Sequence, residues 1–278
     1  MRVANQSVVS RFLGMRKFLL FAAACFSLAA VRVRAEVVHF PGPGGIVLRG
    51  TLVLPDGPAR PPAIVALHGC GGPFPARDRQ WAELFAAQGH VVLFPDSFGS
   101  RGLGPQCTIK TRVAKSDGLR RLDAFAAAEW LASRPDVKDG GIALVGWSNG
   151  GATVLAAAGR AADQPHGLFT AFVAFYPGCT GISRLPEYEP SAPMLILVGE
   201  RDDWTPIGPC RDLAGRWAGR IRLIGYPDSW HDFDAPGLPV RTHGGLPWAP
   251  GGVAHAGTNA AAREDALRQV TSFLAAHR

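Results

Sequence analysis

A serine flanked by glycines stands between an apolar run and an alanine-rich run. The segment reads Gly146-Trp147-Ser148-Asn149-Gly150-Gly151 and directly follows Ile142 to Val145. This order predicts a strand, a sharp turn and a helix, with Ser148 at the apex of the turn. Such a turn crowds the backbone, so residues without a side chain are needed beside the serine. A hydroxyl held there would act as a nucleophile once a base takes its proton.

A histidine and an acid supply the rest of that chemistry. His231 comes shortly after the apolar run Ile221 to Tyr226, and Asp202 shortly after Met194 to Val198. The imidazole would remove the proton of Ser148, and the carboxylate would orient the imidazole and stabilise its charge. The pattern therefore predicts acyl transfer by a triad of Ser148, Asp202 and His231. Alternative acids are Asp203, Asp228 and Asp232.

Two backbone N–H groups are candidates to stabilise the oxyanion of such a reaction. One belongs to Asn149, which begins the helix after the serine, and the other to Cys70 in His68-Gly69-Cys70-Gly71-Gly72. This glycine-rich stretch follows the short apolar run Ala63 to Leu67. We interpret His68 itself as a structural, hydrogen-bonded residue.

Several aromatic side chains near these positions are candidates to line an apolar substrate pocket, and core packing is the alternative for each of them. The candidates are Trp147, Trp204, Trp230, Tyr176 and Phe98. Arg101 is a candidate to bind a substrate carboxylate, with a solvated loop position as the alternative.

These residues need a scaffold that brings the ends of several strands to one edge. Strand and helix patterns alternate from residue 36, which predicts an α/β fold with a mostly parallel sheet of about eight strands and helices on both faces. Functional groups in such sheets gather at the carboxyl ends of the strands. Further strands are expected at 37–40, 46–54, 90–94 and 171–175, and helices at 78–88, 113–133, 205–218 and 260–276. The 113–133 helix is expected to have Leu119, Leu122, Ala126 and Trp130 on one face.

Composition indicates a globular domain with a cleaved leader. Residues 1–35 hold six basic residues and no acid, so they carry six of the seven net positive charges, and 23 basic and 22 acidic residues remain. No basic stripe remains to favour nucleic acid. Met15-Arg16-Lys17, an apolar stretch and Ala35 are typical of a secretory signal peptide, with Met15 as an alternative start. Lipid attachment at Cys25 and an uncleaved anchor are the alternatives, and no stable membrane association is expected after cleavage.

Residues 36–278 are then expected to form a single domain. The irregular segment Ala235 to Gly257 is too long for an idle connection and is expected to pack over the site or to form part of it. The remaining cysteines are Cys70, Cys107, Cys179 and Cys210, which allow one or two disulfides in three possible pairings, or four free thiols. No ligand spacing for a metal is present, and we expect no cofactor.

The chain resembles the dienelactone hydrolase family of α/β-hydrolases from about Val37 to its last helix. The resemblance rests on the segments already quoted, on Pro95-Asp96-Ser97-Phe98 and on Trp230-His231-Asp232-Phe233. The order serine, acid, histidine is that of α/β-hydrolases. The namesake enzymes carry a cysteine where this chain has Ser148, which favours ordinary ester hydrolysis over the namesake substrate.

The expected function is therefore that of a periplasmic or secreted serine hydrolase that cleaves small carboxylic esters or lactones. A peptidase or polyester depolymerase with the same triad is an alternative, and so is a silent binding protein of this fold. The sequence does not indicate an oligomeric state.

Overall fold

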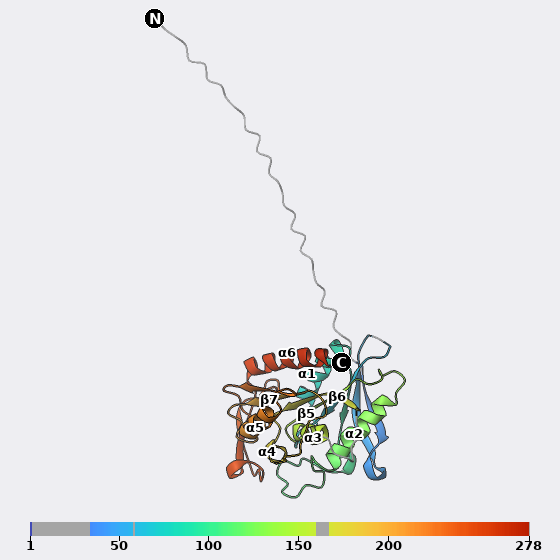
Figure 1. The fold of residues 1–278 in the computed structure, drawn as a ribbon, viewed down its shortest axis with the longest axis horizontal. Helices are drawn as coiled ribbons and strands as arrows, with labels where there is room; N and C mark the ends of the chain where they lie inside the picture. Colours follow the sequence, from blue (N-terminus) through green and yellow to red (C-terminus); the bar gives the residue numbers. More distant parts are fainter. Residues whose placement is uncertain (2–33, 58, 160–166, 278) are drawn as a thin grey trace. The chain divides into compact units, whose positions relative to one another are not determined.

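A twisted sheet with helices on both faces forms the framework of the protein (Figure 1). The structure is a computed structural model, and it describes residues 34–57, 59–159 and 167–277 together with Met1. In these ranges the large sheet has eight strands in the order β1-β2-β4-β3-β5-β6-β7-β8. Strand β2 pairs antiparallel with β1 and β4, and the other neighbours are parallel. The predicted fold class is confirmed.

The strands agree closely with the apolar runs of the sequence. They are β1 (Arg34–Pro41), β2 (Val47–Leu54), β3 (Ala63–Leu67), β4 (Val91–Pro95), β5 (Ile142–Trp147), β6 (Phe169–Phe175), β7 (Met194–Gly199) and β8 (Ile221–Tyr226). Every residue of β3, β5 and β7 is buried, because helices cover both faces of the parallel part.

The main helices are α1 (Pro75–Ala87), α2 (Leu119–Ala132), α3 (Asn149–Ala158), α5 (Gly208–Arg216) and α6 (Ala260–Ala276), with the short α4 (Thr180–Ser183). In Figure 1, α1 and α6 lie on one side of the sheet and α2, α3 and α5 on the other. The Nε2 of Gln88, which caps α1, donates to the hydroxyl of Thr271 in α6 at 2.8 Å, and this bond joins the two helices on their shared face.

Helix α2 differs from its prediction in both start and orientation. It begins at Leu119 after Gly118, and residues 113–118 form turns. Leu122 is 40% exposed, whereas Arg120 and Asp123 are fully buried. The apolar pattern failed here because these two charged side chains have partners inside the protein, as described below.

The long irregular segment contains a small hairpin. Strand β9 (Arg241–Gly244) pairs with β10 (Val253–Ala256), and a 3-10 turn at Pro250–Gly252 precedes β10. Two further 3-10 turns lie at Pro43–Gly45 and Gly99–Arg101.

The expected leader lies outside the described residues except for Met1, Arg34 and Ala35, and so do Met15 and Cys25. Ala35 belongs to β1, where it pairs with Val53. Within the described ranges, no helix combines the length and the apolar character that a membrane crossing needs.

Candidate active site

Ser148 occupies a strained turn between β5 and α3. Its φ is +53° and its ψ is −114°, a conformation that L-residues rarely adopt. A Cβ on Gly150 would lie 2.2 Å from the carbonyl oxygen of Leu67, and one on Gly146 would lie 2.4 Å from the carbonyl oxygen of Gly150. The predicted need for glycines on both sides of the serine is confirmed, because any side chain would collide with backbone.

His231 is hydrogen-bonded to Asp202 in a buried pair. The distance between Nδ1 of His231 and Oδ2 of Asp202 is 2.8 Å, and both side chains are at most 2% exposed. The other oxygen, Oδ1, accepts from the backbone N–H groups of Trp204 at 2.9 Å and Thr205 at 2.8 Å. The hydroxyl of Thr205 lies 3.0 Å from Oδ2. Hydrogen bonds to both of its oxygens therefore fix the orientation of the Asp202 carboxylate.

The electrostatics of this pair favour a histidine that takes up a proton. Burial lowers the pKa of His231, but the charge of Asp202 and its hydrogen bond outweigh burial, so the pKa is raised overall. The Nε2 atom of the ring is buried and forms no hydrogen bond with Ser148 or any other described residue.

The alternative acids have other partners. Asp203 pairs with His255, with Oδ2 2.7 Å from Nδ1. Asp228 forms an ion pair with Arg201 and is 70% exposed. Asp232 lies 3.6 Å from a guanidinium nitrogen of Arg77. Among the described acids, Asp202 is the one that hydrogen-bonds His231.

A pocket of about 420 Å³ brings the candidate nucleophile together with both oxyanion candidates. Ser148, Asn149, Cys70, Trp204 and Thr205 all belong to its lining. Trp204 also packs on the ring of His231, with 4.8 Å between ring centroids. In the described part of the chain, the N–H groups of Cys70 and Asn149 donate no hydrogen bond to protein atoms, so both are available to a ligand.

Arg120 links the two segments that carry these N–H groups. Its guanidinium donates to the carbonyl oxygen of His68 at 2.6 Å and to Oδ1 of Asn149. Burial lowers its pKa to about 9, against the opposing charge of Asp123. No sequence pattern indicates this role, because a charged residue on a helix is normally assigned to the solvent side.

The other predicted pocket residues lie outside this pocket. Trp147 and Tyr176 are fully buried, and Phe98 is 2% exposed and packs on His68. Trp230 stacks on His255 at 4.7 Å. Arg101 is not a free anion receptor, since both of its terminal nitrogens bind Asp123, at 2.8 and 2.7 Å.

The carboxylate of Asp234 accepts hydrogen bonds from three buried aromatic side chains. Its carboxylate accepts from Nε1 of Trp81 at 2.8 Å, Nε1 of Trp147 at 2.9 Å and the hydroxyl of Tyr176 at 2.5 Å. The Tyr176 ring in turn packs against His231, with 4.5 Å between centroids. Burial raises the pKa of Asp234, while the charge of Arg77 and these hydrogen bonds oppose the shift. Tyr176 thus packs against His231, Trp147 is held in the core by Asp234, and neither side chain lines the pocket of Ser148.

The segment between β8 and α6 contributes to the pocket, as the sequence predicted. Trp248 and Pro250 belong to the lining. Nε1 of Trp248 donates to the carbonyl oxygen of Ile109 at 3.1 Å, and Arg112, another lining residue, stacks on its ring. The segment is joined to His231, because the N–H of Gly257 donates to the carbonyl oxygen of that residue at 2.8 Å. Sequence reasoning placed the segment but missed Trp248 and Arg112, because neither lies in a periodic pattern.

Both disulfides border the pocket. Cys70 is bonded to Cys107 and Cys179 to Cys210, which settles the pairing that the sequence left open. Cys70 and Cys179 line the pocket, so each bond joins its wall to a neighbouring segment. Disulfides of this kind are typical of an oxidising compartment. Across the described ranges, no group of three or more His, Cys, Asp or Glu residues is placed to hold a metal ion.

The fold and this arrangement define an α/β-hydrolase. The model of the dienelactone hydrolase family matches residues 48–278, and the chain belongs to that family. Membership places it among hydrolases of small molecules. No curated protein matches the chain by sequence.

Solved structures of the same fold come from several hydrolases. A putative dienelactone hydrolase from Klebsiella pneumoniae is 18% identical, with a TM-score of 0.67 over 88% of this chain and 99% of that one. A dienelactone hydrolase from Anabaena variabilis is 21% identical, with a TM-score of 0.63 over 88% and 98%. A puromycin-hydrolyzing peptidase from Mycobacterium tuberculosis is 18% identical, with a TM-score of 0.65 over 90% of this chain and 40% of that one.

Proposed function

We propose that this chain is an exported serine hydrolase that cleaves carboxylic ester or lactone bonds through an acyl-enzyme on Ser148. The observation that carries the proposal is the buried 2.8 Å hydrogen bond between His231 and Asp202. It fixes the proton of a neutral imidazole on Nδ1 and leaves Nε2 as the basic atom. Trp204, which packs on this ring, lines the same pocket as Ser148.

In the first half-reaction the hydroxyl oxygen of Ser148 attacks the carbonyl carbon, and its proton passes to Nε2 of His231. The imidazolium that forms is stabilised by Asp202, which stays ionised. The N–H groups of Cys70 and Asn149 receive the negative oxygen of the tetrahedral intermediate. When the intermediate collapses, the C–O bond to the alcohol breaks and Nε2 returns its proton to the leaving oxygen.

In the second half-reaction water takes the place of the alcohol. Nε2 removes a proton from the water as its oxygen attacks the acyl carbon, and the same two N–H groups stabilise the second intermediate. As the bond between the acyl carbon and the oxygen of Ser148 breaks, Nε2 gives the proton taken from water to that oxygen, which releases the acid and restores the serine hydroxyl. No cofactor takes part in either step.

A peptidase or polyester depolymerase would use the same residues on a different leaving group. The similarity in fold to a puromycin-hydrolyzing peptidase favours keeping this second candidate. A silent binding protein is the third, and the intact site argues against it.

Labelling with a fluorophosphonate tests the nucleophile. We expect a single adduct on Ser148, found by peptide mass spectrometry and absent from Ser148→Ala and His231→Ala. No adduct, or an adduct that survives His231→Ala, would contradict the proposed roles. Turnover of short p-nitrophenyl esters, lactones and peptide amides, with Ser148→Ala as the control, then separates the esterase from the peptidase.

Export is supported by the basic, apolar leader and the two disulfides. We expect the mature protein in the periplasm or medium, with its first residue near Glu36. The mass of the intact protein from each cell fraction tests this, because lipid attachment at Cys25 or an uncleaved leader would each give a different mass.

A further inference from the structure

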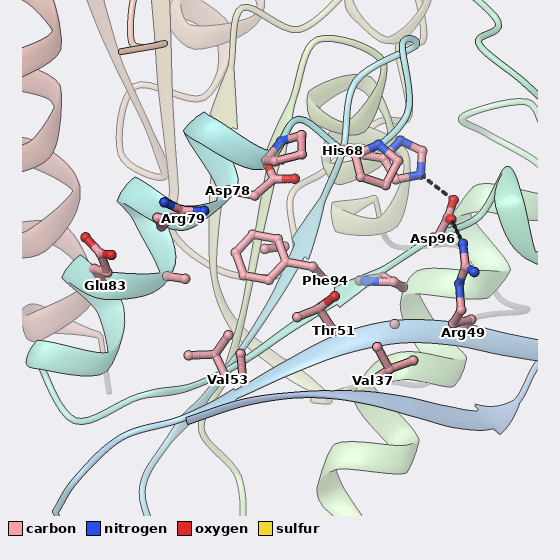
Figure 2. Close-up of a pocket in the computed structure, with 17 residues that line it drawn as sticks. Val37, Arg49, Thr51, Val53, His68, Asp78, Arg79, Glu83, Phe94 and Asp96 are labelled. Atoms are coloured by element: carbon pink, nitrogen blue, oxygen red, sulfur yellow. Dashed lines mark hydrogen bonds and ion pairs between the residues drawn. The ribbon is translucent and has the colours of Figure 1, made fainter. Parts of the chain in front are cut away.

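A second and larger cavity lies between α1 and the antiparallel strands of the sheet. Its volume is about 610 Å³, and Figure 2 shows α1 on one side of it and β1 and β2 on the other. It shares no lining residue with the pocket of Ser148 among the described residues. Cavities of this volume commonly hold small molecules. The proposed reaction makes no use of it.

His68 presents an unsatisfied acceptor to this cavity. Its Nδ1 lies 2.8 Å from the carbonyl oxygen of Gly69, which only accepts, and 3.4 Å from a guanidinium nitrogen of Arg120, which only donates. That nitrogen already donates to the carbonyl oxygen of His68 at 2.6 Å, so the shorter contact to Gly69 decides the tautomer: the ring donates from Nδ1 and a neutral ring accepts at Nε2. The side chain is 4% exposed, and Nε2 is buried with no hydrogen-bond partner among the described residues. A buried acceptor without a donor is costly, and a bound molecule that donates would remove this cost.

The charge state of His68 is set by its surroundings. Burial is the largest cause that lowers its pKa, and the charges of Arg120 and Arg77 add to it, whereas the bond to Gly69 opposes. The ring is therefore neutral at pH 7, and Nε2 offers a lone pair.

The charged group nearest to Nε2 of His68 is the carboxylate of Asp96, and its charge is already balanced. Oδ1 of Asp96 lies 3.9 Å from Nε2 of His68, and Figure 2 shows the two side chains facing each other. Oδ1 already accepts from the N–H of Gly99 at 2.7 Å, and Oδ2 is paired with Arg49 at 2.8 Å. Since Arg49 balances this carboxylate, the end of the cavity has two acceptors and no net charge to attract an ion.

The walls beyond this end are mainly apolar. Val53 and Phe94 come from the sheet and Ala82 from α1, while the charged Arg79 and Glu83 are exposed. The half-buried Asp78 also lines the cavity; its Oδ1 lies 3.5 Å from the guanidinium of Arg77, and its Oδ2 accepts from the N–H of Phe74 at 2.8 Å. A molecule that fits must therefore bury an apolar body and present a hydrogen-bond donor at one end.

We propose that this cavity binds a neutral, largely apolar alcohol or phenol whose hydroxyl donates to Nε2 of His68. An anion would place its charge against Asp96, and an ether or hydrocarbon of the same size would leave Nε2 unsatisfied. This site is independent of the reaction on Ser148.

Calorimetric titration with 2-naphthol and 2-methoxynaphthalene tests the proposal, because the two probes have the same rings and only the first has a hydroxyl. We expect 2-naphthol to bind about tenfold more tightly, as the loss of one hydrogen bond to a buried acceptor implies. Equal affinity of the two probes would overturn the proposal.

The location of binding is tested with two variants of β2. Thr51 lines the cavity and is exposed, so Thr51→Trp fills the cavity without disturbing the core, and we expect it to weaken 2-naphthol binding at least tenfold. Val47→Trp is the matched control, because Val47 is exposed on the same side of the same strand and lies outside the lining. Binding that persists in Thr51→Trp would refute the site.

Nitrogen-15 NMR tests whether the hydroxyl of 2-naphthol donates to Nε2 of His68. The ¹⁵N resonance of its Nε2 is expected to move when 2-naphthol binds and to stay in place with 2-methoxynaphthalene. His68→Phe is expected to bind both probes equally. An unmoved resonance at saturating 2-naphthol would show that the hydroxyl does not meet His68.

Discussion

Replacing Asp202 by asparagine is expected to place the proton of His231 on the wrong nitrogen. Oδ1 of Asp202 accepts from the N–H groups of Trp204 and Thr205, so the amide oxygen of the asparagine must take that place. The amide NH₂ would then face Nδ1 of His231, which must become an acceptor. Nε2 would carry the proton and could not accept one from Ser148.

The magnitude follows from the two backbone donors. Turning the amide around would restore the active tautomer, but it would set its NH₂ against both N–H groups. Each unsatisfied buried donor costs about 1–3 kcal/mol, so the active form would be disfavoured by about 2–6 kcal/mol. At about 1.36 kcal/mol per factor of ten, kcat should fall by between about 30-fold and about 3 × 10⁴-fold.

Steady-state hydrolysis of p-nitrophenyl acetate measures this loss, with Asp203→Asn as the matched control. Asp203 is partly exposed and pairs with His255, so its replacement should change kcat less than about threefold. If Asp202→Asn retained more than a tenth of the parent kcat, or if both variants lost the same activity, the assignment of the acid would be wrong.

Three further results are expected. Because the pKa of His231 is raised, kcat/KM should fall as the pH drops through a value above 6.5. Asp202→Asn should shift this acidic side of the pH–rate profile to lower pH. An unchanged profile would contradict the pairing of His231 with Asp202. Gly150→Ala places a Cβ 2.2 Å from a carbonyl oxygen of β3, so its thermal midpoint should fall by several degrees, whereas Gly181→Ala, in open space, should melt like the parent. Replacing Cys70 and Cys107 by serine opens a loop of 37 residues, so the free energy of unfolding should fall by about 3–4 kcal/mol, and kcat should fall as well. Chemical denaturation and steady-state kinetics measure the two effects, and no change in either would show that this disulfide does not support the pocket.

Much of the fold follows from the apolar runs alone. The bounds of β3, β8 and α6 agree with the sequence pattern residue for residue. These elements are continuous apolar or amphipathic runs between clear breakers, so local pattern and tertiary structure agree. The turn at Ser148 was predictable for the same reason, since its glycines are required by backbone contacts that a strand–turn–helix pattern already implies.

The rest of the site depends on partners far away in the sequence. In the sequence, Arg120 and Asp123 are typical of a solvent-exposed helix face. Only the folded chain shows that the carbonyl oxygen of His68 binds Arg120 and that the guanidinium of Arg101 binds Asp123. Trp147 has the residue type of a pocket wall, but it points into the core, where Asp234 binds its indole N–H. Disulfide pairing and the place of Trp248 are likewise set by the approach of distant segments, which no periodicity encodes.

The carboxylate of Asp234 also bears on how this part of the protein opens. Its three donors come from α1, β5 and the end of β6, and it lies three residues after His231. If any one of these segments separated, a fully buried carboxylate would lose a donor, so the segments should open together and not one at a time. Amide exchange around His231 is therefore expected to proceed only when these segments open together, which would keep His231 in place until they do.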